Sequence, residues 1–317
     1  MREFTRIQRI CDAFSNDDPS LIVAPGDDAA VITVPEGYEL VVSSDMLVAA
    51  VHFFADADAA DIGYKSLAVN LSDLAAMSAW PRWFSLSLSM PQNLPGVWLD
   101  GFISGIRQCA TEQAPDISLI GGDLTGGPLA INITIQGLVP TGQAVLRSGA
   151  KPGDDIYVSG MLGAPALALK QWYKSGRGKP SFILQRLLRP QAQIELGYKL
   201  RNVVTSMLDI SDGLIGDLTH MANASKVGMN IFQKQIPIFP DCINTRGFEP
   251  SMALVGGDEY QLAFCAPTNM YRQISSIAET LEIPITKIGK VTAGQNVVCL
   301  GENGEPVKLP KTGWQHF

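Results

Sequence analysis

Aspartates in five short, turn-like segments are the feature that most constrains how this 317-residue chain can fold. Each stands beside glycine, serine or a second acid, and these neighbours predict positions at turns or at the ends of helices and strands. Taken singly, each has an ordinary interpretation as a helix cap, an Asx turn or a solvated loop. The first, continued as GDDAAV, predicts a turn that enters a buried strand. The segments are GDD at 26–28, SSD at 43–45, NLSD at 70–73, GGD at 121–123 and DISDG at 209–213.

Convergence of these segments in the fold would create an electrostatic problem. Two carboxylates about 5 Å apart repel by roughly 3 kcal/mol at an effective dielectric near 20, and a few such pairs exceed the stability of a typical domain. Basic residues are sparse near the five segments. We therefore expect divalent cations as counterions, and oxygen ligands without a His/Cys cluster favour Mg²⁺ over Zn²⁺.

The composition limits the partners of the chain. With 24 basic and 31 acidic residues the formal net charge is −7, which argues against a nucleic-acid-binding surface. An anionic ligand must then be held locally, and bound Mg²⁺ would attract a phosphate. No apolar run reaches the roughly 18 residues that cross a bilayer, so we expect no membrane partner. The cysteines are widely spaced and form no CxxC pair, which is typical of reduced thiols in a cytoplasmic protein.

Hydrophobic periodicity predicts a mixed sheet with helices in the first half of the chain. Alternating apolar residues predict strands at 83–90 and 130–136, and helical spacing predicts helices at 57–79 and 95–113. Glycine, proline and charge cluster at 146–155, which predicts a domain boundary with domains at 1–145 and 146–317.

The second half predicts a further set of strands and helices. A strand is expected at 155–160, followed by a glycine turn into a helix that ends near residue 173. Further helices are expected at 191–203, after the aspartate-rich turn within 208–225, and at 268–281, with apolar strands at 262–265 and 285–291.

Among known phosphate-binding motifs, one leaves an alternative open. A Walker A loop is absent, because Lys179 is followed by proline, and the glycine-loop, HRD and DFG set of protein kinases is absent too. DISDG, with carboxylates at Asp209 and Asp212, is similar to the metal loop of magnesium-dependent inositol-type phosphatases. A magnesium-dependent phosphomonoesterase therefore stays open as an alternative.

The motifs taken in order resemble the thiamine-monophosphate kinase family of the aminoimidazole ribonucleotide synthetase superfamily. The segments that carry the resemblance are GDDAAV, SSDMLVAAVHF at 43–53, NLSDLAAMSAWP at 70–81, GGDLT at 121–125, LRSGAKPGD at 146–154, DISDGLIGDL at 209–218 and GGDEYQL at 256–262. The chain lacks the N-terminal glycine-rich segment with a reactive cysteine expected of a selenophosphate synthetase and the C-terminal cysteine of a hydrogenase maturation protein. Another ATP-using member of the superfamily is the remaining alternative.

The resemblance implies a fold and an activity. The fold class would be a two-domain α/β and α+β fold, in which an N-terminal ATP- and Mg²⁺-binding domain pairs with its mate in a homodimeric β-barrel. A C-terminal α+β domain would complete the ATP and substrate cleft. The activity would be the transfer of the γ-phosphoryl group of ATP to thiamine monophosphate, the last step in making thiamine diphosphate.

The resemblance also implies roles for individual residues. The magnesium ligands would be Asp28, Ser43, Ser44, Asp45, Asp73, Asp123, Asp209 and Asp212. ATP would contact Gly122, Asp123, Arg147 and Ser211, and the catalytic set would be Asp45, Asp73, Asp123 and Arg147. Thiamine monophosphate would contact His52, Gln261 and Trp314. Gln261 departs from the family pattern, which usually has a glutamate there, and an amide cannot neutralise the cationic thiazolium ring.

Overall fold

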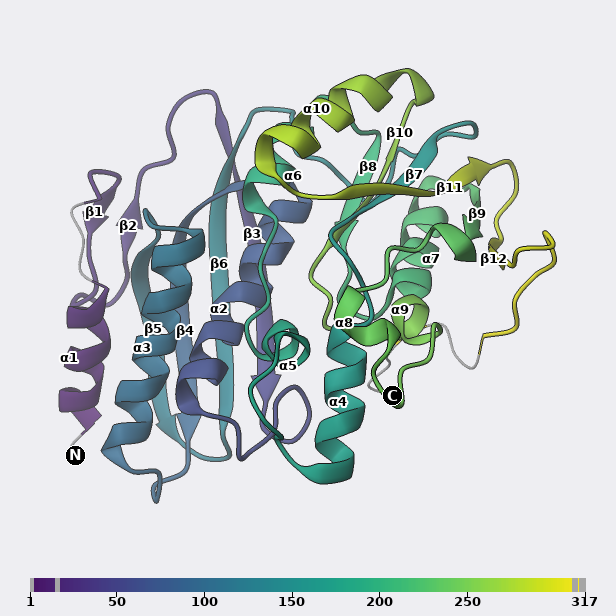
Figure 1. Ribbon diagram of the computed structural model, residues 1–317. Helices are drawn as coiled ribbons and strands as arrows, with labels where there is room; N and C mark the ends of the chain where they lie inside the picture. The colour runs from purple at the N-terminus through teal and green to yellow at the C-terminus, as the bar shows by residue number, and fades with distance from the viewer. Residues whose placement is uncertain (1–2, 15–17, 310–312, 314–317) are drawn as a thin grey trace. The chain divides into compact units, whose positions relative to one another are not determined.

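The computed structural model describes residues 3–14, 18–309 and 313, and it divides the chain into two compact units (Figure 1). Unit 1 comprises Met1–Leu74 and Ala79–Gly142, and unit 2 comprises Ala75–Ser78 and Gln143–Phe317. The last crossing between the units lies between residues 142 and 143, just before the glycine- and proline-rich stretch at 146–155.

Unit 1 is built on a mixed four-stranded sheet in the order β3-β6-β4-β5. Strand β6 is antiparallel to both of its neighbours, and β4 and β5 are parallel. The strands and helices expected from periodicity are present at β4, β6, α2 and α3. The elements of unit 1 are α1 (Glu3–Ala13), β1 (Leu21–Val23), β2 (Val31–Ile32), β3 (Tyr38–Val48), α2 (Ala59–Ala76), β4 (Trp80–Met90), α3 (Gly96–Gln113), β5 (Ser118–Gly126) and β6 (Ala130–Pro140).

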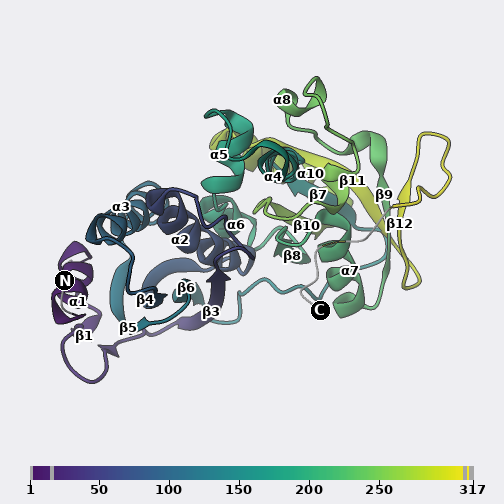
Figure 2. The ribbon, with the colours of Figure 1, turned by 90° about the horizontal axis from the view of Figure 1, so that it is seen from below.

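The two faces of this sheet differ. Helices α2 and α3 lie along one face, as Figure 2 shows, and that face carries buried side chains such as Leu86 on β4 and Ile133 on β6. On the other face the edge strand β3 exposes Leu40, Val42 and Met46, residues that are 40%, 55% and 58% exposed. An apolar row of this kind on a sheet face is typical of a contact surface.

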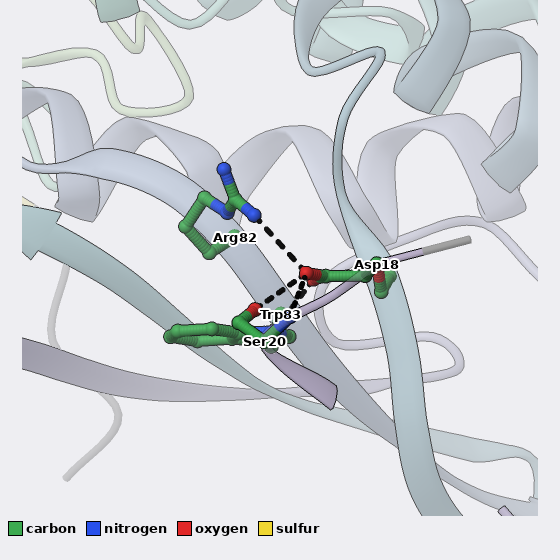
Figure 3. Close-up of polar contacts among 5 residues, drawn as sticks. Asp18, Ser20, Arg82 and Trp83 are labelled. Carbon is green, nitrogen blue, oxygen red and sulfur yellow. Dashed lines mark hydrogen bonds and ion pairs between the residues drawn. The ribbon is translucent and has the colours of Figure 1, made fainter. Parts of the chain in front are cut away.

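A buried carboxylate attaches the segment after α1 to this sheet. The side chain of Asp18 is 2% exposed and accepts hydrogen bonds from Ser20, from Arg82 Nη2 at 3.2 Å and from Trp83 Nε1 at 2.9 Å (Figure 3). Burial alone would raise the pKa of Asp18, but these hydrogen bonds and the Arg82 charge outweigh it and hold the pKa below its usual value. The chain entering the GDD segment is therefore anchored to β4.

Unit 2 contains a six-stranded sheet in the order β12-β9-β11-β7-β10-β8, in which only β12 and β9 pair in parallel. Helix α7 packs on the sheet through Leu214 and Leu218, which are fully buried with Ile156, Leu208 and Met229. The elements are β7 (Asp155–Ser159), α4 (Ala164–Ser175), α5 (Phe182–Leu188), α6 (Ile194–Leu200), β8 (Ser206–Asp209), α7 (Leu214–Ser225), β9 (Gly228–Phe232), η1 (Gln233–Gln235), α8 (Pro240–Ile243), α9 (Met252–Val255), β10 (Leu262–Ala266), η2 (Thr268–Met270), α10 (Tyr271–Leu281), β11 (Ile285–Thr292) and β12 (Val297–Leu300).

Sequence periodicity missed or misplaced several elements, among them the edge strands β3 and β5 of the unit 1 sheet. Helix α5 was not expected, because it has seven residues and follows a glycine- and proline-rich stretch. The helix expected at 191–203 is shorter and spans Ile194–Leu200. The helix expected at 268–281 begins with a 3₁₀ turn before α10. No described helix is long and apolar enough to cross a membrane.

Candidate functional site

The expected turn positions are correct for only some of the aspartate segments. Asp209 ends β8 and Asp212 lies in the turn before α7, as expected. Asp45, Asp73 and Asp123 instead lie inside β3, α2 and β5, so the expectation is wrong for these three. Strands β3 and β5 are the two edges of their sheet, where a polar side chain keeps access to water.

The helix-facing side of β3 holds the first group of predicted ligands. Ser43 Oγ donates a hydrogen bond to Asp73 Oδ2, which joins β3 to α2. Two residues along β3, the backbone N–H of Asp45 donates to Asn70 Oδ1 at 3.2 Å. Asn70 is fully buried and its Nδ2 donates to Ser66 O at 3.0 Å. Helix α2 therefore holds Ser43, Asp45 and Asp73 together as a group of oxygen donors.

Gly122 and Asp123 lie on β5 at the opposite edge of the same sheet. Gly122 has φ +153°, and an ideal Cβ there would lie 1.8 Å from the carbonyl oxygen of Leu86 on β4. Only glycine therefore fits between the two strands at this position. Asp123 pairs in register with Ser87, which lies between Leu86 and Leu88 on β4. Leu86 and Leu88 are buried under α2 and α3, and neighbouring residues of a strand point to opposite faces, so Asp123 belongs to the other face of the sheet.

Asp45 and Asp123 are too far apart to bind one metal ion within one chain. Register places Asp45 opposite Ile133, Ile133 opposite Leu86, and Leu86 opposite Gly122. Three strand spacings of about 4.8 Å separate the two edges by about 14 Å. Two oxygens on one Mg²⁺ are separated by about 4 Å at most, because each lies about 2.1 Å from the ion.

Ser44 and Asp28 lie in more exposed surroundings. Ser44 Oγ is 3.0 Å from Thr134 Oγ1 and accepts from Asn132 Nδ2 at 3.1 Å. The side chain of Asp28 is exposed, and its backbone N–H donates to Asp27 Oδ1 at 2.8 Å. The buried strand expected after GDDAAV is wrong, because β2 has two residues and Val31 is 50% exposed.

His52 is held by the backbone of the turn after β3. Its Nδ1 accepts a hydrogen bond from the backbone N–H of Val48 at 3.0 Å, and its carbonyl oxygen accepts from Lys65 Nζ at 3.4 Å. Because Nδ1 is the acceptor, the proton of the neutral imidazole belongs on Nε2.

In unit 2 the DISDG loop runs beside the GGDEYQL segment. The backbone N–H of Asp258 donates to Ser211 O at 2.9 Å, and that of Tyr260 donates to Ile210 O at 2.8 Å. Asp258 and Tyr260 both have left-handed φ values of +65° and +50°. Non-glycine residues in this region store about 1–3 kcal/mol of strain each and tend to occur at functional sites.

Asp217, in the first turn of α7, holds the DISDG loop from the other side. Its Oδ2 accepts the backbone N–H groups of Asp212 at 3.1 Å and Gly213 at 3.0 Å, and its side chain is almost fully buried. Burial and the neighbouring Asp212 carboxylate raise the pKa of Asp217 to about 7, while the two hydrogen bonds and Arg147 oppose the rise. Arg147, Asp212 and Asp217 are thus electrostatic neighbours.

Arg147 lies in an exposed loop that is fixed at its base by Ser225, the last residue of α7. Ser225 Oγ accepts from the backbone N–H groups of Gly149 and Ala150, both at 3.2 Å, and donates to Arg147 O at 3.3 Å. Helix α7 therefore positions Arg147 through one end and the DISDG loop through the other.

Gln261 and Glu259 are buried inside unit 2, with 1% and 2% of their surfaces exposed. With the Gln261 amide oriented so that both of its atoms are satisfied, its oxygen accepts from Arg186 Nη2 at 2.7 Å and its nitrogen donates to Ser159 Oγ at 3.0 Å. Glu259 Oε1 accepts the backbone N–H of Gly163, where helix α4 begins. Burial raises the pKa of Glu259 to about 8, and the Gly163 hydrogen bond and the Arg186 charge only partly oppose it.

Two contributors to these groups were missed by the sequence analysis. Asn70 stands three residues before Asp73, and residues three apart on a helix share a face, so their spacing could have indicated a common role. Asp217 stands five residues after Asp212, in the turn where an acid reaches back to the free N–H groups of a helix start. Trp314 lies outside the described residues.

Comparison with protein families defines the class of the chain. Residues 26–139 match the AIR synthase related protein, N-terminal domain, and residues 142–301 match the AIR synthase related protein, C-terminal domain. The fold and these two matches define a two-domain AIR synthase-like α/β protein.

Individual relatives narrow this class. The thiamine-monophosphate kinase of Escherichia coli (strain K12) is 40% identical over 323 residues, which cover 99% of this chain and 98% of the relative. The crystal structure of thiamine-monophosphate kinase from Stenotrophomonas maltophilia K279a is 38% identical with a TM-score of 0.88, covering 97% of this chain and 98% of that one. AaThiL complexed with AMPPCP and TMP is 28% identical with a TM-score of 0.79, covering 100% of this chain and 99% of that one. The chain belongs to the thiamine-monophosphate kinase family.

Proposed function

We propose that this chain transfers the γ-phosphoryl group of ATP to thiamine monophosphate and releases ADP and thiamine diphosphate. The observation that carries this function is the 40% identity with a thiamine-monophosphate kinase over 99% of the chain. A relative of the same fold is complexed with AMPPCP, an ATP analogue, and with TMP. The motif residues of both units supply the chemistry that such a transfer needs.

The chain's part in this transfer is alignment and charge neutralisation. The acceptor is a phosphate monoester whose oxygen is already anionic near neutral pH, so no general base is required. Arg147, in its exposed loop, offers two parallel N–H donors to a phosphate. Ser211, exposed in the DISDG loop, and Gly122 are proposed to contact the nucleotide.

The proposed cofactor is Mg²⁺, and the donor atoms suit it. When bound, it would neutralise the charge that develops on the transferring phosphoryl group. Ser43, Asp45 and Asp73 offer only oxygen atoms, as do Asp209 and Asp212. Among the described residues no three His, Cys, Asp or Glu side chains are arranged to hold a metal. A small number of protein ligands suits Mg²⁺, which keeps several waters and takes substrate phosphates as ligands.

We further propose a homodimer in which the open faces of two unit 1 sheets pack together as a β-barrel. The exposed Leu40, Val42 and Met46 support this, because the contact would remove their apolar surface from water. Asp123 lies on the same open face at an edge strand, about 14 Å across the sheet from Asp45. Asp45 belongs to the helix-facing side of β3, so we propose that Asp123 of the partner subunit completes its site by reaching around the edge of β3.

Mixing two inactive variants tests this arrangement. Asp45→Asn and Asp123→Asn should each abolish turnover with Mg²⁺ while leaving the fold intact. Heterodimers formed by unfolding and refolding a mixture of the two should regain activity, because one site per dimer then has both carboxylates. If the mixture stays inactive although heterodimers form, both carboxylates serve the same chain.

Two coupled assays test the reaction itself. ADP formation that requires both ATP and thiamine monophosphate supports the kinase. Release of inorganic phosphate from thiamine monophosphate without ATP would instead indicate a phosphomonoesterase that uses DISDG as its metal loop. The alternative is not favoured, because two relatives that match 99% and 97% of the chain at 40% and 38% identity are thiamine-monophosphate kinases.

A further inference from the structure

Helix α7 begins without a conventional cap. Its N-cap residue is Gly213, which has no side chain to accept a hydrogen bond from the first N–H groups of the helix. A larger residue is excluded there, because φ is +128° and an ideal Cβ would lie 2.8 Å from the backbone carbon of Val255. Another acceptor has to satisfy the backbone N–H groups where the DISDG loop enters the helix.

Asp217 supplies that acceptor from inside the helix. One oxygen, Oδ2, accepts the N–H groups of both Asp212 and Gly213, at 3.1 and 3.0 Å. The backbone N–H of Asp217 donates in return to Gly213 O at 3.0 Å. As in a capping box, an acid inside the helix reaches back to the N-cap N–H; here it does so from the fourth helical position, and the returning bond is the first i→i−4 bond of the helix.

The held loop is the one that presents Ser211 and Asp212. On the other side of the loop, the N–H group of Asp258 donates to Ser211 O at 2.9 Å. The backbone of Gly257 packs so closely there that an ideal Cβ would lie 2.5 Å from the same oxygen. The Asp217 side chain is 5% exposed, so solvent cannot readily replace its hydrogen bonds. Loss of the Asp217 acceptor would remove the hydrogen bonds to the N–H groups of Asp212 and Gly213, while the hydrogen bond from Asp258 to Ser211 O would remain.

We propose that Asp217 is a positioning residue for phosphoryl transfer, which fixes the backbone from which Ser211 and Asp212 reach the nucleotide and its metal. This role rests on the proposed kinase function. Asp217 acts through the loop and does not itself contact substrate. Residues that orient metal ligands in this way typically change metal affinity or activity by about 10- to 100-fold when replaced.

The test compares Asp217→Ala with Asp217→Asn. The alanine variant should raise the half-saturating Mg²⁺ concentration and lower kcat/KM for ATP by about 10-fold or more, with the KM for thiamine monophosphate nearly unchanged. The asparagine variant keeps a side-chain oxygen as acceptor and should stay within about 3-fold of wild type. Ser181→Ala is the matched control, because Ser181 Oγ accepts from Leu184 N at 3.1 Å to cap α5 in the same unit.

Each outcome decides the proposal. An alanine variant that is less stable but has wild-type Mg²⁺ and ATP dependence, like the Ser181 control, would show that Asp217 is only a helix cap. An asparagine variant as impaired as the alanine variant would show that the charge is required, and positioning by hydrogen bonding would be overturned. If Asp217→Ala does not fold, the asparagine variant and Asp217→Ser decide by the same kinetic criteria. A wild-type enzyme that forms no ADP with thiamine monophosphate would instead refute the proposed function.

Discussion

Replacing Gly122 by alanine should force strands β4 and β5 apart. The added Cβ would lie 1.8 Å from the carbonyl oxygen of Leu86 and 2.6 Å from its carbon. The closest comfortable carbon–oxygen contact is about 3.3 Å, so the strands must separate locally by roughly 1.5 Å. That displacement breaks the ladder around Leu86 and leaves one or two buried backbone groups unpaired.

Gly121 is a matched control for this substitution. Its φ of +156° is nearly that of Gly122 at +153°, so alanine suffers a similar backbone strain of about 1–3 kcal/mol at either position. No heavy atom lies within 4 Å of an ideal Cβ at Gly121. The difference between the two variants therefore isolates the collision, and each unpaired buried backbone group costs about 1–3 kcal/mol. We expect Gly122→Ala to lose about 2–4 kcal/mol more unfolding free energy than Gly121→Ala.

Urea unfolding of the two variants, followed by tryptophan fluorescence, measures this difference. Hydrogen exchange of peptides from 118–126 provides a local measurement, and faster exchange in β5 is expected only for Gly122→Ala. Equal unfolding free energies for the two variants, within about 0.5 kcal/mol, would refute the steric reasoning.

Three further changes test other parts of the structure. Asp18→Ala should lower the unfolding free energy by about 3 kcal/mol, because it leaves the buried Trp83 indole N–H without its acceptor; a loss below about 1 kcal/mol in urea unfolding would count against the anchor. The raised pKa of Glu259, about 8, means that the folded form keeps a proton that the unfolded chain has lost, so stability should fall as the pH rises from about 5 to 8, by up to about 1.4 kcal/mol per pH unit. Glu259→Gln should remove this part of the slope, and an unchanged slope between pH 7 and 8 in thermal unfolding would contradict the assignment. Ser225→Ala should loosen the Arg147 loop and raise the KM for ATP several-fold. Thr219→Val, which removes a hydroxyl that donates to Ile215 O within α7, should not; equal KM values for the two variants would remove Ser225 from this role.

Periodicity located β4, β6, α2 and α3 of unit 1, but not the edge strands β3 and β5, whose sequences lack a regular apolar alternation. The serine–leucine alternation of 83–90 predicts β4, and the apolar spacing of 95–113 predicts α3, because each pattern matches the side-chain period of one kind of element. The mixed character of the unit 1 sheet was also confirmed, since β4 pairs antiparallel with β6 and parallel with β5. Short elements such as α5 were not predicted, because seven residues are too few to show a clear helical period.

The grouping of the aspartates could be predicted only in part. The link between the SSD and NLSD segments requires knowing that α2 covers β3, and the separation of Asp123 depends on strand order, which local patterns do not contain. Asp209 and Asp212 were placed correctly, because they are neighbours in the sequence and precede a recognisable helix. The sequence thus predicts which polar residues stand together within one segment, but it does not predict the distances between segments.

The burial of Gln261 illustrates the same limit. The family resemblance implies that Gln261 contacts thiamine monophosphate, yet Gln261 is 1% exposed and its oxygen accepts from Arg186 on α5. A partner 75 residues away, on a helix that periodicity missed, makes this burial tolerable. Its difference from the usual family glutamate therefore concerns packing inside unit 2 as well as substrate choice.

The most direct test of the central claim follows the phosphoryl group itself. Wild-type protein is incubated with Mg²⁺, thiamine monophosphate and ATP labelled on its γ-phosphate, and the products are separated. Direct transfer predicts that the label appears in thiamine diphosphate in equal amount to the ADP formed. Label found only in inorganic phosphate, with no labelled thiamine diphosphate, would contradict the kinase function.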